Sequence, residues 1–316
     1  MPTASTCTLV LLFLATLSAQ TIQPGTIFRI QPAESTRRLV SVDSSGQELL
    51  FSFADSRATE LVRTDLAGTE QARCTVPGGS REALFTPQRQ TILISRFGAV
   101  VSELSPECQV VRNAKFSQKY AHLLIDGSDA LGVMGEAILS LDLSTGQPGP
   151  VTPFPSLGDD PAYFVRTAPG IIAVVHIGTG RTAFVNRRDP PPRVHQCLDP
   201  AVLKRSEQLD AHELLFAPAV GSWYGSVLLV LSGFRAQDGA PLYALGPDGN
   251  CTKLALLKVP DLPALVKAPT SNRPSSNPRG ELSIDALVAT ANALLLIDRG
   301  SGFVAKYSAE ELRRHE

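Results

Sequence analysis

Five polar side chains each stand at the start of an apolar run. If these runs stack side by side as strands, the five side chains come together and could bind a ligand or a metal ion. They are Arg38, Glu82, His122, Glu213 and Asp285, with about forty residues or more between successive members. Around one opening, three carboxylates and an imidazole could hold a divalent cation through oxygen and nitrogen ligands. The same groups could instead be solvated or paired with neighbouring charges, as structural ion pairs commonly are. Glu82, His122, Glu213 and Asp285 are therefore candidate metal ligands.

Arginine recurs at a second equivalent position, in the loop that would follow the second strand of each repeat. These residues are Arg57, Arg96, Arg181, Arg235 and Arg299. A ring of guanidinium groups could bind carboxylate or phosphate bidentately. It could also pair with the carboxylates that open the apolar runs, and acidic partners on the same face favour this second interpretation.

Nucleophilic catalysis has no motif in this chain. There is no Gly-x-Ser-x-Gly elbow, and no Gly-rich phosphate loop follows an apolar run. The histidines have no repeated acid partner at a useful spacing; they include His122, His176, His195 and His212. The sequence therefore leaves enzymatic activity open and favours a role without catalysis.

The elements that must position these residues are apolar runs of strand length, separated by breaks rich in Gly, Pro, Asp and Ser. The second copy is the clearest, with runs at 82–86, 91–95, 100–104 and 108–112. Strands arriving in fours at a regular period, with almost no room for crossover helices, are typical of an antiparallel β-propeller blade. The sequence predicts an all-β fold of six four-stranded blades, with strands a to d counted from the axis outward.

The sixth copy lacks a fourth strand, because its third strand, 303–307, is followed by a capping box that predicts a short helix at about 308–316. An unpartnered apolar run, 26–31, precedes the first complete copy. We expect this N-terminal run to supply strand d of blade six and so to close the ring. Each ladder hydrogen bond would contribute about 1 kcal/mol, and burying Phe28 and Ile30 would add about 1.5 to 3 kcal/mol each.

The repeats are least regular around blade five. Stacking the copies predicts strand a of this blade at 213–217, preceded by a helix that begins at Asp199 and ends near Gln208. The long loops at 198–211 and 260–282 flank the blade. Long loops on a regular scaffold often carry binding specificity, and these two could equally have no role.

The last copy, Leu294 to Tyr307, is similar to the NHL repeat, in which an apolar run, Asp-x-Gly-Asn and an apolar-aromatic strand recur; Ser301 stands where that pattern has Asn. The segment from Ile171 to Asn186 resembles the repeat of YVTN-type surface propellers. The resemblance implies a six-bladed propeller of the NHL or YVTN type and transfers no functional residue. Gluconolactonase-like propellers hold a metal in the general arrangement described for the run-opening residues, but none of their local motifs is present.

The first nineteen residues carry no charge and contain the apolar run Leu9 to Leu17, followed by Ser18-Ala19-Gln20. This pattern predicts a secretory signal peptide, residues 1–19, cut near Ala19. The run is shorter than the roughly 20 residues that a membrane-spanning helix needs, so a transmembrane anchor is not expected. The mature chain, 20–316, is then one domain in a secreted or periplasmic protein.

Four cysteines follow the predicted cleavage point: Cys74, Cys108, Cys197 and Cys251. An even number in an exported protein permits two disulfides, with three pairings that the sequence does not distinguish. All four are expected on the outermost strand of a repeat, where neighbouring blades splay apart, so buried or unpaired thiols are the alternative.

The net charge limits the kinds of binding partner. The chain has 29 basic and 30 acidic side chains, a net charge of −1, and this balance disfavours binding to nucleic acid. We expect a secreted, monomeric binding module for an extracytoplasmic protein or glycan. The alternative is a metal-dependent hydrolase or lactonase that uses a divalent cation at the channel mouth.

Overall fold

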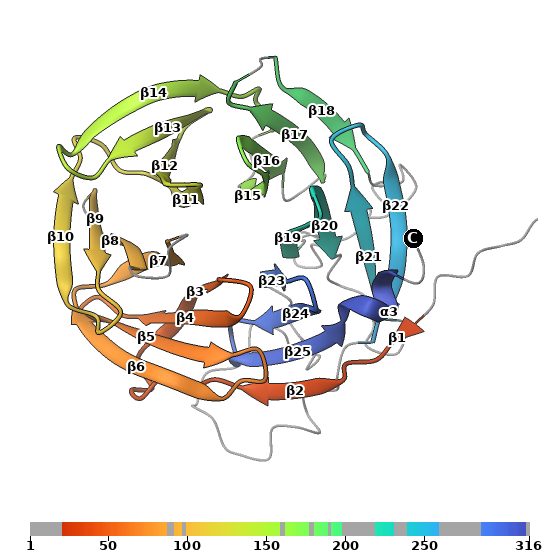
Figure 1. Cartoon of the computed structure of the whole chain (residues 1–316), viewed down its shortest axis with the longest axis horizontal. Coiled ribbons are helices and arrows are strands. Elements are labelled where there is room, and N and C mark those ends of the chain that lie inside the picture. Colours follow the sequence, from red (N-terminus) through yellow and green to blue (C-terminus); the bar gives the residue numbers. More distant parts are fainter. Residues whose placement is uncertain are drawn as a thin grey trace, which may run out of the picture.

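The described strands of the computed structural model form a ring of six sheets around a central axis, and each sheet contains four antiparallel strands (Figure 1). The predicted six-bladed β-propeller is therefore confirmed. The structure describes residues 21–86, 92–96, 99–158, 162–176, 180–188, 191–197, 219–230, 239–258 and 286–313. The predicted signal peptide, the helix expected from Asp199 and the two long loops around blade five lie outside these residues.

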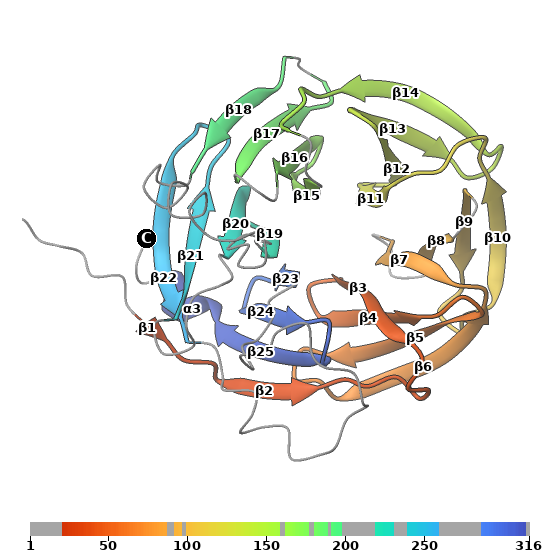
Figure 2. The same ribbon diagram turned by 180° about the vertical axis from the view of Figure 1, so that it is seen from behind.

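Each blade runs from its innermost strand outward, and Figure 2 shows the same order from behind. Blades one and two consist of β3 Arg38–Ser44, β4 Glu48–Ala54, β5 Ala58–Asp65, β6 Glu70–Pro77, β7 Ser80–Phe85, β8 Ile92–Arg96, β9 Val100–Leu104 and β10 Val110–Lys115. Blades three and four consist of β11 His122–Asp126, β12 Asp129–Met134, β13 Ala137–Asp142, β14 Gln147–Pro153, β15 Ala162–Ala168, β16 Ile171–His176, β17 Arg181–Asn186 and β18 Arg193–Gln196.

Blades five and six complete the ring. They consist of β19 Ala219–Trp223, β20 Ser226–Val230, β21 Ala240–Leu245, β22 Cys251–Leu257, β23 Ala286–Ala289, β24 Ala293–Asp298 and β25 Phe303–Ser308, with β2 Thr26–Arg29 as the outermost strand of blade six. The predicted tail helix is present as α3, Ala309–Arg313. No helix among the described residues is long and apolar enough to cross a membrane.

The core lies between the blades, where each face of one sheet packs against its neighbour. Between blades one and two, for example, Leu50 and Leu61 pack with Ile94 and Leu104, and all four are at most 1% exposed. Middle strands are thus covered on both faces, which explains why they read as near-continuous apolar runs. Outer strands differ: β14 is exposed over most of its length.

The N-terminal strand closes the ring as the sequence predicts. β2 pairs antiparallel with β25, from Thr26 opposite Lys306 to Arg29 opposite Phe303. Phe28 packs against Gly68 of blade one. Gly68 has a φ of +87° and no side chain, so the phenyl ring of Phe28 can lie directly against its backbone. Ile30 is buried between blades six and one, so the strand joins the first and last blades through packing as well as hydrogen bonds.

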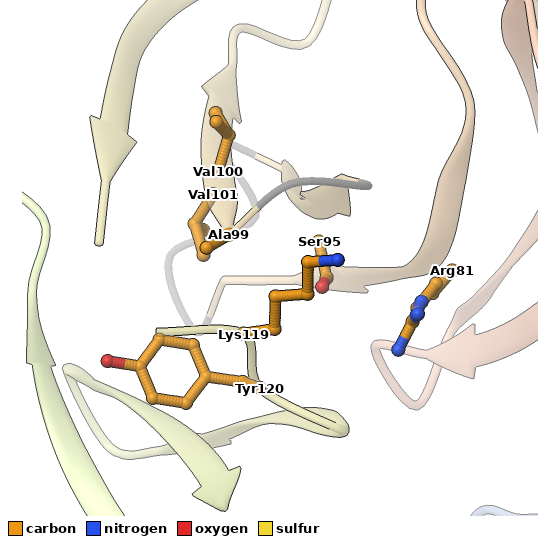
Figure 3. A pocket seen from close by; sticks show the side chains of 7 residues that line it. All are labelled: Arg81, Ser95, Ala99, Val100, Val101, Lys119 and Tyr120. Atoms are coloured by element: carbon orange, nitrogen blue, oxygen red, sulfur yellow. The ribbon is translucent and has the colours of Figure 1, made fainter. Parts of the chain in front are cut away.

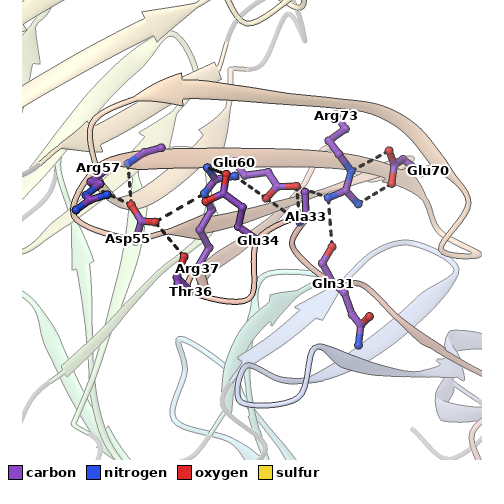
Figure 4. A network of polar contacts seen from close by, with 11 residues as sticks. Gln31, Ala33, Glu34, Thr36, Arg37, Asp55, Arg57, Glu60, Glu70 and Arg73 are labelled. Atoms are coloured by element: carbon purple, nitrogen blue, oxygen red, sulfur yellow. Dashed lines mark hydrogen bonds and ion pairs between the residues drawn. The ribbon is translucent and has the colours of Figure 1, made fainter. Parts of the chain in front are cut away.

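A fully buried carboxylate fixes the segment that leads from β2 into blade one. Glu60, on β5, accepts the backbone N–H of Ala33 with both oxygens at 3.0 Å. It also pairs with Arg37 at 3.1 Å and with Arg73 (Figure 4). Arg73 in turn donates to the carbonyl oxygen of Gln31 at 3.2 Å. A buried charge persists only when it is fully paired, so the closing segment and this cluster are mutually dependent.

The sequence did not reveal a fifth strand on blade five. β1, Thr21–Ile22, pairs parallel with the outer strand β22, opposite Leu256 and Leu257. Ile22 is 2% exposed in the core between blades five and six. The segment from 21 to 29 therefore contacts both blades before the chain enters blade one. Two residues are too short a run to give a strand pattern.

The innermost described strand of blade five is Ala219–Trp223, and the predicted strand at 213–217 lies outside the described residues. Tyr224 and Gly225 have φ values of +46° and +85° and form a two-residue turn, with Trp223 opposite Ser226. Positive φ at both central residues is the signature of a type I′ two-residue hairpin, so this turn sets the inner strand immediately before it. Aligning the repeats by their apolar residues alone favoured the apolar run at 213–217 and took no account of this turn.

Both cysteine pairs join neighbouring blades. Cys74 on β6 is bonded to Cys108, which precedes β10, and their Cα atoms are 6.3 Å apart. Cys197, just after β18, is bonded to Cys251 at the start of β22, with Cα atoms 5.3 Å apart. Only Cys74 and Cys251 lie on outer strands, contrary to the expectation for all four. Because Cys108 and Cys197 lie at strand ends, the outer strands can diverge without separating the sulfur atoms.

We predict that Phe28→Ala lowers the free energy of unfolding by about 2 kcal/mol, because the ring loses a side chain packed between the first and last blades. The control is Ile27→Ala on the same strand, where the side chain is 37% exposed and the expected change is within about 0.5 kcal/mol. Chemical denaturation measures both. Equal losses for the two variants would contradict closure through the buried face of β2.

Candidate functional site

The candidate site is the central channel, a cavity of about 700 Å³ bordered by the innermost strand of every blade. Its lining residues are Val40–Ser45, Arg81, Glu82, Leu84–Thr86, Ala121–Ile125, Tyr163–Arg166, Val220–Ser222, Ala286–Ala289 and Arg299. Because each blade repeats the same strand order, all inner strands begin at one mouth of the channel and end at the other. We call these the first mouth and the second mouth.

Two of the predicted run-opening residues meet at the first mouth. Glu82 on β7 and His122 on β11 both line the channel, and Glu82 Oε1 lies 2.7 Å from His122 Nδ1. The other oxygen of Glu82 accepts the backbone N–H of Leu123. Arg38 is exposed and does not line the channel. Glu213 and Asp285 lie outside the described residues, and Ala219 opens the innermost described strand of blade five.

The metal site remains a prediction, because two of its four ligands are outside the described part of the chain. Within that part, no group of three or more His, Cys, Asp or Glu side chains is arranged to hold a metal ion. Glu82 already uses both oxygens to bind blade three. It therefore acts as a link between two inner strands.

The arginine column is scattered in the structure. Arg299 lines the channel, whereas Arg57 is exposed in the turn before β5. Arg181 is half-buried and its Nη1 donates to the carbonyl oxygen of Leu157 at 3.4 Å. Arg235 and the side chain of Arg96 lie outside the described residues. Glu82 is paired with His122 and not with a described arginine, so the acidic and basic columns do not form one continuous ring there.

Polar side chains of the inner strands bind the neighbouring blade, and the sequence analysis missed three of them, Ser41, Asp43 and Asp126. Such side chains accept backbone N–H groups of the next blade: Ser41 from Ala83 at 2.9 Å, Asp43 from Phe85 at 2.7 Å, Glu82 from Leu123, and Asp126 from Gly170 at 3.1 Å. Donor and acceptor lie 41 to 44 residues apart, the blade period. Aligning polar positions within the strands, and not only at their starts, would have revealed them.

These contacts have a simple cause. The inner strand of each blade is an edge of its sheet. The backbone N–H groups on its free edge have no partner strand to bind. Backbone donors away from bulk water need an acceptor. Side-chain oxygens from the preceding blade provide it in the first half of the ring, so the polar groups around the channel also hold neighbouring blades together.

Asp43 and Asp126 occupy equivalent roles but have different electrostatic environments. Burial raises the pKa of Asp43 to about 6, and the negative charge of Glu82 adds to the effect. Burial would also raise the pKa of Asp126, but hydrogen bonds from Gly170 N–H and from the guanidinium groups of Arg187 and Arg166 hold it below its usual value. No lysine, arginine or histidine pairs with Asp43 among the described residues.

A second, much smaller hollow lies beside the channel, between blades two and three (Figure 3). Arg81, Ser95, Lys119 and Tyr120 are among its lining residues, and its volume is about 10 Å³. That volume holds about one water molecule. The hollow is too small to be a separate ligand site.

No family model matches this chain, and no curated protein matches it. Solved structures with a similar fold include the WD40 repeats of RRP9, with a TM-score of 0.59 and 6% identity over 92% of this chain and 99% of that one. A catalytically inactive virginiamycin B lyase from Staphylococcus aureus, solved with quinupristin, has a TM-score of 0.54 and 8% identity over 90% and 88% of the two chains. The WD40 propeller of Doa1 has a TM-score of 0.52 and 12% identity over 87% and 80%. At these identities the likeness establishes the propeller fold alone.

We predict that Asp43→Asn stabilises the protein at pH 8 by at most about 3 kcal/mol, and that the gain shrinks towards zero at pH 4. In the folded protein, burial raises the pKa of this carboxyl from its ordinary value of 3.8 to about 6. Its ionised form therefore destabilises the fold above pH 6, and protonation removes that cost as the pH falls. Asparagine keeps an oxygen that can accept the Phe85 N–H.

Denaturant unfolding at several pH values measures this difference. The control is Asp142→Asn, at an exposed turn where hydrogen bonds from Ser144 and Thr145 lower the pKa of the carboxyl to about 2. That variant should be less stable than the wild type above pH 4, with the gap closing only below it. A gap for Asp43→Asn that stays constant from pH 4 to pH 8 would contradict the assignment.

Proposed function

We propose that this protein is an exported binding module that receives its ligand, a glycan or a segment of another protein, at the central channel. The observation that carries the proposal is the channel itself, about 700 Å³ in volume and lined from all six blades. Ligand sites in proteins typically measure about 300 to 1,000 Å³, with mostly apolar walls and a few placed polar groups.

The composition of the channel wall supports a binding role. Leu84, Leu124, Phe164 and Val288 line the channel and are only half-buried, so apolar surface remains accessible along the axis. Accessible apolar side chains in a cavity, together with a few polar groups, are typical of a ligand site. Charged side chains at both mouths would orient that ligand.

The alternative, a metal-dependent hydrolase or lactonase, has less support. Its best-placed carboxylate, Glu82, is already bound to His122 and to the backbone of Leu123. The similar structures include WD40 propellers and a lyase, so the ring is compatible with binding and with catalysis. The last repeat is similar to the NHL repeat, and the segment from Ile171 to Asn186 resembles YVTN-type surface propellers, which favours a surface-exposed binding protein.

Export is part of the proposal. It is supported by the apolar, uncharged N-terminal segment and by two disulfides, Cys74–Cys108 and Cys197–Cys251. Disulfides persist in oxidising compartments and are rare where glutathione keeps thiols reduced. The signal peptide and the cysteine pairs are independent features of the sequence, and both indicate the same compartment.

We predict that protein produced with its own N-terminus in a secreting host begins at Gln20 and contains no free thiol. N-terminal sequencing and thiol titration under denaturing conditions measure the two properties. A Cys251→Ser control should expose one reactive thiol, at Cys197. A chain that keeps residues 1–19, or that stays fully reduced in the host, would contradict export.

We predict that Ala289→Trp reduces ligand binding at least about tenfold, because the indole would obstruct the channel near the second mouth. Ala289 lines the channel at the end of β23. Binding is measured on arrays of glycans and of extracellular proteins, followed by titration of the strongest hit. The control is Val151→Trp on the outer strand β14, where the side chain is 58% exposed; it should bind as the wild type does. Unchanged binding by Ala289→Trp would place the ligand elsewhere.

A further inference from the structure

Among the described residues that line the channel, Asp43 is a carboxylate without a cationic partner. Asp43 lines the cavity near the second mouth and accepts the backbone N–H of Phe85 at 2.7 Å. No cationic side chain of the described residues pairs with it. The other inner-strand carboxylates differ: Glu82 is paired with His122, and Asp126 with Arg166 and Arg187 at 2.9 Å each.

The wall of the cavity that contains Asp43 includes the apolar side chains of Leu84, Phe85, Leu124, Ile125 and Val288, together with polar residues such as Ser44 and Thr86. A half-buried charge beside such a wall is costly unless an opposite charge compensates it. Burial raises the pKa of Asp43 to about 6, so the group is mostly ionised at neutral pH and this cost is present.

We propose that the channel binds an organic ammonium group carried on an apolar body, with the ammonium paired to Asp43 and the body against the apolar wall. The inference rests on the proposed function, in that it takes the channel to be the ligand site, and it adds the chemical class of the ligand. An amine fits both features at once, since it supplies the missing positive charge and covers accessible apolar surface.

Anionic ligands fit less well. Arg166 lines the cavity, but its guanidinium is bound to Asp126 at 2.9 Å. Arg81 and Arg299 belong to the first mouth, and both already make other contacts. A carboxylate or phosphate would have to break such contacts and approach Asp43 against electrostatic repulsion. A neutral ligand would leave the Asp43 charge uncompensated.

Three probes with one phenylpropyl body and different charge test the inference: 3-phenylpropylamine, 3-phenylpropanol and 3-phenylpropanoate. Calorimetric titration at pH 7.5 is expected to show the ammonium binding to the wild type at least about tenfold more tightly than the alcohol, and the carboxylate binding most weakly. Asp43→Asn should bring the ammonium to the affinity of the alcohol. Asp142→Asn, at an exposed turn remote from the channel lining, should behave as the wild type.

The outcomes separate this inference from the proposed function. Equal affinity for the three probes, or a preference for the ammonium that survives in Asp43→Asn, would overturn the inference. If these probes bind without charge preference and lose binding in Ala289→Trp, the channel is still a ligand site and only the ammonium assignment fails. If no probe binds the wild type, the ammonium inference fails, and the array measurement with Ala289→Trp still decides the proposed function.

Discussion

A ring of blades is stable only if its first and last members are joined, and in this chain the joint is a short strand with a buried ion cluster behind it. β2 completes blade six, and the following residues enter blade one over the fully buried carboxylate of Glu60. Glu60 needs Arg37, Arg73 and the Ala33 N–H, because an unpaired charge at that depth would be strongly destabilising. The position of every inner strand, and hence the channel, depends on this closure.

Much of the fold could be predicted from the sequence because its main determinant is local. Strand-length apolar runs with a period near forty residues give the number of blades, and the missing fourth strand of the last copy gives the closure. Prediction was incomplete where the deciding information was not in the apolar pattern. The innermost described strand of blade five is set by positive φ at Tyr224 and Gly225, and β1 is only two residues long. Both cysteine pairs depend on positions at strand ends, which stacking does not resolve.

The candidate site was less predictable for a physical reason. Residues that open strands are conspicuous in a repeat alignment, and Glu82 with His122 was found that way. Asp43 and Asp126 lie inside strands, where alternation makes a polar residue look like an ordinary surface position. Their role is evident only once the next blade is in place, because their hydrogen-bond donors are 42 and 44 residues away. Their contrasting environments come from neighbouring guanidinium groups that no local pattern brings together.

The ties between neighbouring blades are of different kinds around the ring. Disulfides join blades one to two and four to five, and the N-terminal segment spans blades five and six before the Glu60 cluster holds it against blade one. Blade three has polar ties of another type on both sides: Glu82 with His122 and Leu123, and Asp126 with Arg166, Gly170 and Arg187. Blade three therefore lies between two disulfide-joined pairs of blades and is itself in neither pair. The covalent links divide the ring into cross-linked and non-cross-linked sectors, and the polar ties of blade three lie in the sector without a disulfide.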